Sequence, residues 1–135
     1  MKSRLILMGG ILGFLGVLAG TFGAHGLNTI LPQAILDNPT DLAKRHDWID
    51  TAVLYHLVHA IAILALAAFP AQKSGTIILA AMLFTAGIAL FSGALYILAI
   101  TGFTPLGMVA PVGGLAFLAG WICVITASFK SDHND

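Results

Sequence analysis

Two histidines and a tyrosine lie inside one long apolar stretch of the sequence, Ile49–Phe69, as Tyr55, His56 and His59. An ionisable side chain at membrane depth is costly, so its presence there indicates a functional site. An imidazole can ligate a metal, relay a proton or hydrogen-bond a bound molecule. We therefore expect any chemistry of this chain to centre on these three residues.

Other polar side chains are predicted to join them from neighbouring helices. Tyr55 and His59 are four residues apart and share a helix face, as do Ser92 and Tyr96 in a later apolar stretch. We expect these two faces to meet, with His25 ending an earlier helix on the same side of the membrane. The candidate ligand-binding set is His25, Tyr55, His56, His59, Ser92 and Tyr96.

Several roles are open for these histidines. A neutral histidine can simply pack, since interhelical hydrogen bonds in membranes average about 0.6 kcal/mol and need no ligand. His25, His56 and His59 could instead hold a metal or haem, or His59 could relay protons. A small lipophilic molecule such as a lipid or quinone could lie between helices at His59 and Tyr96.

Catalysis is not expected. Ser92 and His59 could supply a nucleophile and a base, but no buried acidic residue is expected beside them to orient the base. A single cysteine, Cys123, allows neither an internal disulfide nor a thiolate metal site. We predict a non-enzymatic protein with no cofactor and no metal.

The composition indicates that lipid surrounds most of the chain. Of the 135 residues, 59% are hydrophobic and only 9% are charged, and the mean hydropathy is +0.97. Soluble domains carry roughly 25% charged residues. The six basic and six acidic side chains balance, so nucleic acid is not an expected partner.

Four apolar segments are each long enough to cross a bilayer as a helix, which needs about 20 residues. They are Leu5–Ala24, Ile49–Phe69, Thr76–Ile100 and Leu106–Phe129. None alternates as a membrane strand would. The predicted fold is an all-α, four-helix antiparallel transmembrane bundle forming one domain over residues 1–135.

The first loop, Gly26–Trp48, is the longest and is predicted to contain one or two short helical turns on the outer membrane surface. The second spanning helix should begin near Thr40, a suitable N-cap residue. Two pairs of side chains four residues apart are expected to interact along this helix: Asp41 with Arg45, and His46 with Asp50.

Basic residues predict the orientation, because they concentrate in cytoplasmic segments. Four of them fall on the side of the termini, namely Lys2, Arg4, Lys73 and Lys130, and two fall in the first loop, namely Lys44 and Arg45. This distribution places both termini in the cytoplasm.

Small residues recur through the first segment at helical spacing, as Gly9 with Gly13 and Gly16 with Gly20. The segment also fits a signal peptide, but these pairs allow helix backbones to approach closely, which favours a retained helix. The expected partners are membrane lipid and, through the glycine-rich faces, a membrane-protein partner or a second copy of the chain.

Several motifs, taken in order, resemble one family. Residues 20–27 read Gly-Thr-Phe-Gly-Ala-His-Gly-Leu, residues 91–96 read Phe-Ser-Gly-Ala-Leu-Tyr, and residues 110–114 read Ala-Pro-Val-Gly-Gly. Together with Thr51-Ala52-Val53, Tyr55 and His59-Ala60, they look like the YgdD/YwdK-like family of small bacterial inner-membrane proteins, which has mitochondrial relatives and is classed as a domain of unknown function.

The resemblance implies a four-helix protein of the bacterial inner membrane and no established reaction. His25 and His59 match the family pattern, whereas His56 stands where the family usually has glutamine, which argues against a metal site that needs His56. We expect an accessory or interaction module with a polar site in its outer half. The alternative is binding or transport of a small or lipophilic ligand at His59 and Tyr96.

Overall fold

The computed structural model describes residues 1–69 and 74–129, which form four long helical passes. Each pass is long and apolar enough to cross a membrane, so the predicted four-helix transmembrane fold is confirmed. The passes are α1 (Lys2–His25), α4 (Pro39–Leu66), the continuous run of α5 (Ser74–Gly87), η2 (Ile88–Ser92) and α6 (Gly93–Thr101), and α7 (Ala110–Phe129).

Short elements lie at one end of the bundle. The first loop forms α2 (Leu27–Ile30) and α3 (Gln33–Leu36), and the 3-10 turn η3 (Thr104–Met108) precedes α7. The two short turns of the first loop were predicted, and Pro32 separates them because it cannot extend α2. We call this the loop end, and the end with Lys2 and Phe129 the terminal end.

The third pass differs from the sequence prediction of one regular helix. Its central segment η2 is a π-helix, in which the Gly93 N–H donates to the Ile88 carbonyl five residues back. Here the backbone of η2 lies against Gly113 of α7, where an added Cβ would collide with the backbone nitrogen of Phe91. Such π segments frequently occur at functional sites.

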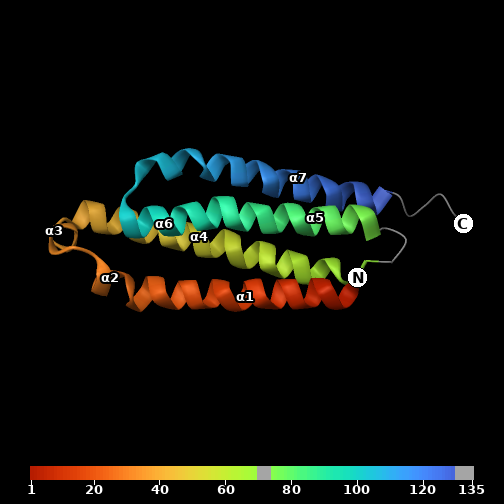
Figure 1. Ribbon diagram of the computed structural model, residues 1–135, viewed down its shortest axis with the longest axis horizontal. Coiled ribbons are helices and arrows are strands. Elements are labelled where there is room, and N and C mark those ends of the chain that lie inside the picture. The colour runs from red at the N-terminus through yellow and green to blue at the C-terminus, as the bar shows by residue number, and fades with distance from the viewer. Residues whose placement is uncertain (70–73, 130–135) are drawn as a thin grey trace, which may run out of the picture.

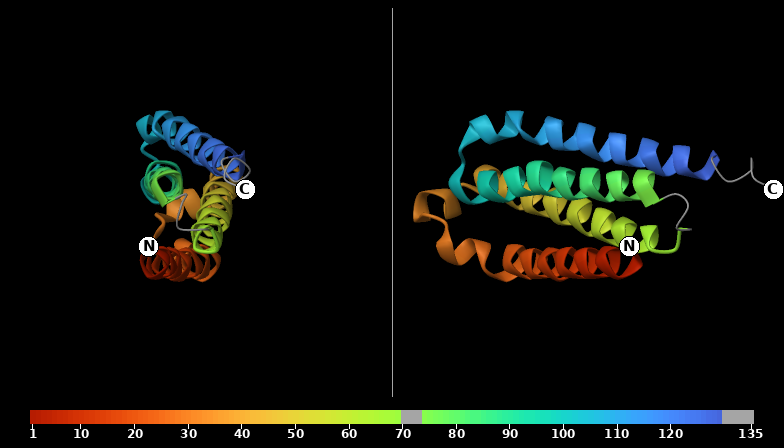
Figure 2. Two further views of the ribbon diagram at one scale, coloured as in Figure 1. Left: turned by 90° about the vertical axis from the view of Figure 1, so that its right-hand side faces the viewer. Right: turned by 45° about the vertical axis from the view of Figure 1, so that its right-hand side comes forward.

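The four passes alternate in direction, so both described ends of the chain lie at the terminal end (Figure 1). Seen end-on, α1 and α7 lie at opposite edges of the bundle, with α4 and the α5–α6 run between them (Figure 2). Helix α1 packs mainly on α4, and α7 mainly on α5 and η2. Helix α4 packs on α1 along one side, and His59 on its other side contacts Trp121 and Phe117 of α7.

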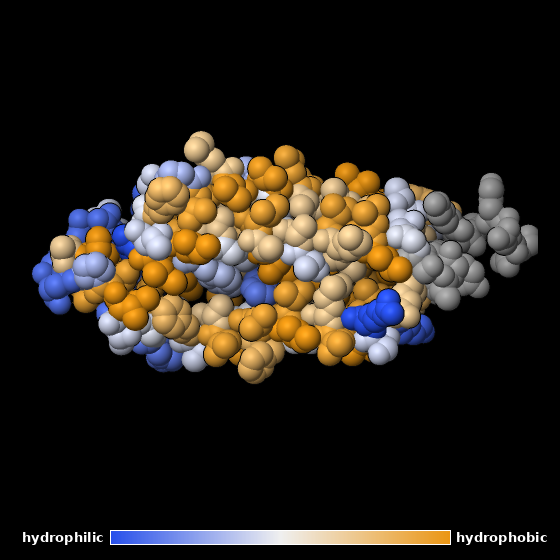
Figure 3. All heavy atoms as spheres, in the orientation of Figure 1, coloured by the Kyte–Doolittle hydropathy of each residue, from blue (hydrophilic) through white to orange (hydrophobic). Residues whose placement is uncertain are grey.

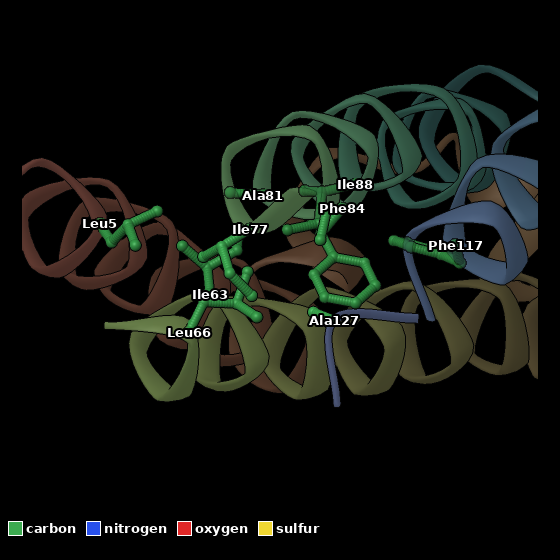
Figure 4. Packing of buried hydrophobic residues seen from close by; sticks show 10 residues of the cluster. Leu5, Ile63, Leu66, Ile77, Ala81, Phe84, Ile88, Phe117 and Ala127 are labelled. Atoms are coloured by element: carbon green, nitrogen blue, oxygen red, sulfur yellow. The ribbon is translucent and has the colours of Figure 1, made fainter. Parts of the chain in front are cut away.

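The main core lies in the terminal half of the bundle, where Phe84 reaches from α5 toward α4 (Figure 4). Its ring and that of Phe117 occupy positions that glycines leave open. A Cβ at Gly120 would overlap the Phe84 ring, and one at Gly87 would overlap the Phe117 ring. The glycines of the third and fourth passes thus allow close packing of large aromatic rings.

The glycine pattern of α1 serves the contact with α4. A Cβ at Gly9, Gly16, Gly20 or Gly23 would press on an α4 side chain, namely Leu64, Leu57, Val53 or Ile49 respectively. Gly10 and Gly13 have nothing within 4 Å of such a Cβ. Most of the small-residue stripe is therefore used within the chain.

The start of α4 differs from prediction in its cap and in its side-chain pairs. Asn38, rather than Thr40, is the N-cap, and its side chain accepts from the Asp41 N–H. Arg45 does not pair with Asp41, because its Nη1 donates to the carbonyls of Ala99 (2.7 Å) and Ile100 (3.1 Å) at the end of α6. The last carbonyls of a helix have no partner within the helix, and a cation that binds them also interacts favourably with the helix dipole.

His46 also bonds outside α4. Its Nε2 lies 3.0 Å from Oδ1 of Asn28 rather than bonding to Asp50. Both departures tie the loop end of α4 to neighbouring elements. Lys73 and Lys130, on which the predicted orientation partly depends, lie outside the described residues.

The outer surface of the passes is apolar, as Figure 3 shows for one face. Large hydrophobic side chains are exposed on every pass, including Phe14 (68%), Ile61 (63%), Met82 (63%) and Leu115 (65%). In water this surface would be costly, whereas in a bilayer it contacts lipid tails of the same character.

Candidate functional site

His56 and His59 share helix α4 but face different neighbours. Three residues along an α-helix correspond to a rotation of about 300°, so the two side chains diverge by about 60°. Because α1 and α7 lie on opposite edges of the bundle, this rotation turns His56 toward α1 and α6, and His59 toward α7. Both are buried, at 6% and 4% exposure.

His59 has a partner for each ring nitrogen. Its Nδ1 lies 2.7 Å from the Tyr55 carbonyl one turn back, and the Trp121 indole Nε1 donates to its Nε2 across 3.2 Å. A carbonyl only accepts and an indole N–H only donates. The partners therefore require a neutral imidazole with its proton on Nδ1, and no ring nitrogen is left for a ligand.

Aromatic rings enclose His59. Phe117 of α7 stacks on it with centroids 3.6 Å apart and an interplanar angle of 12°, and Phe84 lies at 5.2 Å. Tyr55, which is 41% exposed, packs on Phe91 at 4.6 Å. A shallow groove of about 420 Å³ runs along these rings and α7. Around His59 the arrangement is that of a packed polar residue.

His56 has a partner for only one nitrogen. Its Nδ1 lies 3.2 Å from the Tyr96 hydroxyl of α6. Its Nε2 is buried and makes no hydrogen bond within the described residues, although the Leu12 carbonyl of α1 lies beside the ring. The imidazole packs on α1 at Gly16, where a Cβ would lie 3.4 Å from His56 Cδ2. We refer to His56 and Tyr96 as the His–Tyr pair.

Tyr96 of this pair lines a groove of about 480 Å³ between α1 and α6. Tyr96 is the polar member of its lining, which otherwise consists of Leu15, Leu18, Ala19, Phe22, Ile49 and Ile100. Figure 3 shows a hollow between α1 and α6 with hydrophilic surface at its inner side, within a mainly hydrophobic face. The groove is therefore apolar along most of its lining and polar at Tyr96.

The His–Tyr pair keeps one polar hydrogen unused. A neutral imidazole and a phenol bring one N–H and one O–H, and the single bond between them uses one of the two. If Tyr96 donates to Nδ1, the Nε2–H of His56 lies beside the Leu12 carbonyl of α1; if Nδ1 donates, the Tyr96 O–H is free. In the second arrangement Tyr96 can donate to a group that enters the groove, whose lining includes Tyr96 but not His56.

The other predicted site residues lie apart from this pair. Tyr55 faces the groove on the α7 side and supplies its carbonyl to His59. Ser92 is completely buried in η2, and its Oγ has no hydrogen-bond partner within the described residues. His25 is exposed at the end of α1. The expected meeting of His59 with Tyr96 does not occur, since Tyr96 bonds to His56 instead.

The structure does not assemble the metal-binding or hydrolytic sets considered from sequence. No group of three or more His, Cys, Asp or Glu side chains that could hold an ion occurs in residues 1–69 and 74–129. Ser92 Oγ does not bond to His59, whose nitrogens bond to Tyr55 and Trp121. The chemistry available at both histidines is hydrogen bonding.

Sequence reasoning missed Trp121 and Phe117 as partners of His59, and Arg45 as the cap of α6. Trp121 lies deep inside an apolar segment, where a polar ring tip usually finds a partner. The position of Trp121 in the middle of the segment could therefore have indicated a buried hydrogen-bond partner for its indole. For Arg45 the signal was Gly102, which ends α6 at φ +69° and leaves the last carbonyls open.

The fold and the surface define an integral membrane protein of four helical passes. Residues 19–114 match the family described as Protein of unknown function (DUF423), and the chain belongs to that family. Its relatives carry membrane-protein names, in agreement with the apolar surface of the passes.

Three relatives cover nearly the whole chain. The UPF0382 membrane protein YwdK of Bacillus subtilis is 39% identical over 93% of this chain and 95% of its own length. A UPF0382 membrane protein of Haemophilus influenzae is 37% identical over 97% and 98%. The UPF0382 inner membrane protein YgdD of Escherichia coli is 35% identical over 96% and 93%. No solved structure shows a significant match to this chain.

Proposed function

We propose that this protein is a non-enzymatic membrane protein that holds an amphipathic molecule of the bilayer in the groove between α1 and α6. The observation that carries the proposal is the His–Tyr pair. Tyr96, whose hydroxyl lies 3.2 Å from Nδ1 of His56, is the polar residue in the lining of an open apolar groove. A polar side chain that lines an apolar groove can hold the polar end of a bound molecule by a hydrogen bond.

The groove supports a lipophilic occupant. Its volume of about 480 Å³ lies within the ~300–1,000 Å³ range of ligand pockets, which are mostly apolar with a few polar groups. Leu15 and Leu18 of α1 and Ile100 of α6 line its walls. A hydrocarbon or isoprenoid tail fits this lining, whereas a polar metabolite would lose its hydration without replacement.

The pair selects the polar end of the occupant. Because it has one unused N–H or O–H, it can donate to a carbonyl oxygen such as that of an acyl ester or a quinone. This site takes the place of the His59 and Tyr96 site expected from sequence. Lipids and quinones remain the ligand classes that the chemistry supports.

The test is to extract the protein from its native membrane with a nanodisc-forming polymer and measure the bound lipophilic compounds by mass spectrometry. Tyr96→Phe removes only the hydroxyl and should lower the enriched compound about fivefold, equivalent to one hydrogen bond of ~1 kcal/mol. Tyr55→Phe is the matched control, because Tyr55 lines the other groove. Equal enrichment in both variants and the parent protein would refute the proposal.

A second pair of variants separates hydrogen bonding from proton transfer. His56→Gln keeps a side chain that both donates and accepts, so we expect it to retain the compound. His56→Leu should lose it to the same extent as Tyr96→Phe. Loss in both His56 variants would mean that the imidazole itself is required.

An accessory role, in which the protein binds another membrane protein or a second copy of itself, is the second candidate. Gly10 and Gly13 support it, because nothing of this chain lies within 4 Å of a Cβ built there, and small residues let helices of different chains approach. Cross-linking in the native membrane tests it. Gly13→Leu should abolish any cross-linked species while leaving the fold intact.

The proposed location is the bacterial inner membrane with both termini in the cytoplasm. Lys2 and Arg4 lie at the terminal end, and Lys44 with Arg45 at the loop end. The two described pairs balance, so the orientation rests on Lys73 and Lys130, whose positions follow from the sequence alone.

A further inference from the structure

A third groove lies between α1 and α5 at the terminal end, away from the His–Tyr pair. Its volume is about 410 Å³, and Arg4, Met8, Ile78 and Met82 are among its lining residues. Arg4 lies in the first turn of α1, while Met8 lies one turn deeper. The groove therefore has a cationic mouth at the end of the bundle and apolar walls leading toward the membrane interior.

The walls of the groove suit a hydrocarbon chain. Met8 and Ile78 are aliphatic, and Met82 is 63% exposed on the outer surface of α5. The Thr85 hydroxyl, which lies 3.6 Å from the Met8 sulfur, donates to the Ala81 carbonyl at 2.8 Å. No free polar group of these residues competes for a ligand inside the groove.

Charge is distributed unequally between the two ends of the described chain. Its four acidic residues, Asp37, Asp41, Asp47 and Asp50, all lie at the loop end, in α4 or just before it. The described terminal end carries Lys2 and Arg4, and the first turn of α1 has neither an acidic residue nor a side-chain cap. The positive end of the α1 dipole therefore adds to the two cations.

We propose that this groove binds an anionic glycerophospholipid, with its phosphate on the Arg4 guanidinium and one acyl chain along Met8, Ile78 and Met82. Charge complementarity identifies the head group, because an arginine fork matches phosphate oxygens. The apolar walls identify the tail, and they distinguish a lipid from a free phosphate. The site is separate from the proposed function, since it shares no lining residue with the groove between α1 and α6.

The test is native mass spectrometry of the full chain in mild detergent, with added dioleoyl phosphatidylglycerol or dioleoyl phosphatidylcholine. These two probes share their acyl chains and differ in head-group charge. We expect the phosphatidylglycerol adduct to dominate and Arg4→Gln to weaken it about tenfold, because the charge-assisted hydrogen bonds between the guanidinium and the phosphate are lost. Arg4→Lys should retain part of the preference.

Lys2→Gln is the matched control, because it removes the same charge two residues away from a position outside the groove. It should weaken the adduct clearly less than Arg4→Gln does, because it changes only the general attraction of the surface for anionic lipid. An equal loss in Lys2→Gln and Arg4→Gln would overturn the proposal in favour of general surface attraction, and so would an unchanged adduct in Arg4→Gln. Displacement of the lipid by millimolar glycerol phosphate alone would also overturn it, because the acyl chain would then contribute nothing.

Discussion

The Trp121 indole donates to Nε2 of His59 across 3.2 Å, while Nδ1 of the same ring bonds to the Tyr55 carbonyl at 2.7 Å. Phe117 also stacks on the face of this imidazole, with ring centroids 3.6 Å apart. Both ring nitrogens of His59 therefore have partners within the protein, and one face of the ring is covered. We therefore assign His59 to packing between α4 and α7. Among the candidate residues, His56 and Tyr96 keep unused hydrogen-bonding capacity next to a groove, whereas the Oγ of Ser92, which is unpaired among the described residues, is completely buried in η2.

Replacing Trp121 with phenylalanine should destabilise the protein without affecting ligand binding. The variant leaves Nε2 of His59 buried without a donor, and hydrogen bonds in membrane proteins contribute about 0.6 kcal/mol on average and up to ~1.7. Unfolding in mixed detergent and dodecyl sulfate micelles should show a loss of about 1 kcal/mol. Trp48→Phe serves as the control, because no hydrogen bond of its indole occurs among the described residues; an equal loss there would contradict the assignment.

Arg45 should stabilise the loop end by holding the last turn of α6. Its two hydrogen bonds reach the carbonyls of Ala99 and Ile100, and bonds to a charged group contribute about 1.5–3 kcal/mol when well buried. Since Arg45 is only half-buried, we expect Arg45→Met to cost about 1–2 kcal/mol in the same unfolding assay.

Lys44→Met provides the comparison for Arg45. The Lys44 ammonium lies 5.1 Å from the Trp48 ring centroid on an exposed position, where a cation–π contact contributes about 0.5–1 kcal/mol. Its loss should therefore cost less than that of Arg45. If the two variants unfold identically, the cap on α6 contributes nothing beyond its charge.

Two adjacent glycines of α7 should respond differently to alanine. At Gly113 a Cβ would collide with the backbone nitrogen of Phe91 in η2, whereas at Gly114 the nearest atom is Cδ2 of Phe91 at 4.0 Å. A backbone obstacle cannot rotate away, so Gly113→Ala should cost about 1–3 kcal/mol. Gly114→Ala should be neutral or slightly stabilising, because alanine favours the helix. Equal stabilities would mean that α7 shifts freely over η2.

The four passes could be predicted from sequence because their length and hydropathy depend on each segment alone. The His–Tyr pair was predicted only in part. His56 and Tyr96 were both candidates, but the sequence favoured His59 as the partner of Tyr96. Which of two residues on one helix meets a neighbour depends on the rotation of that helix, which the packing of α4 on α1, α6 and η2 determines.

The π-helix η2 and the bond of Arg45 were also beyond sequence reasoning. Apolar spacing in residues 88–92 fits an ordinary helix, and the π geometry forms where the η2 backbone lies against Gly113. The four-residue spacing of Asp41 and Arg45 predicted a local pair. The acceptors that Arg45 uses lie 54 and 55 residues away in sequence. Gly102 signals that α6 ends there, but it does not indicate which side chain reaches the open carbonyls.

Single cysteines will test the proposed orientation, with Cys123→Ser removing the native thiol. The two positions for the new cysteines are Asp47, which is exposed at the loop end, and Lys2, which is exposed at the terminal end. The variants are Asp47→Cys and Lys2→Cys. In intact spheroplasts, a membrane-impermeant maleimide should label position 47 at once and position 2 only after lysis. The reverse pattern would place the termini outside and would contradict the distribution of basic residues.

The central claim is that His56 meets a ligand and His59 does not. Nitrogen-15 NMR of the imidazoles tests it most directly, comparing protein in nanodiscs of bacterial total lipid with the same protein delipidated in detergent. We predict that the ring resonances of His56 shift between the two preparations, while His59 keeps its proton on Nδ1 in both. A shift at His59 with His56 unchanged, or no shift at either ring, would contradict the account.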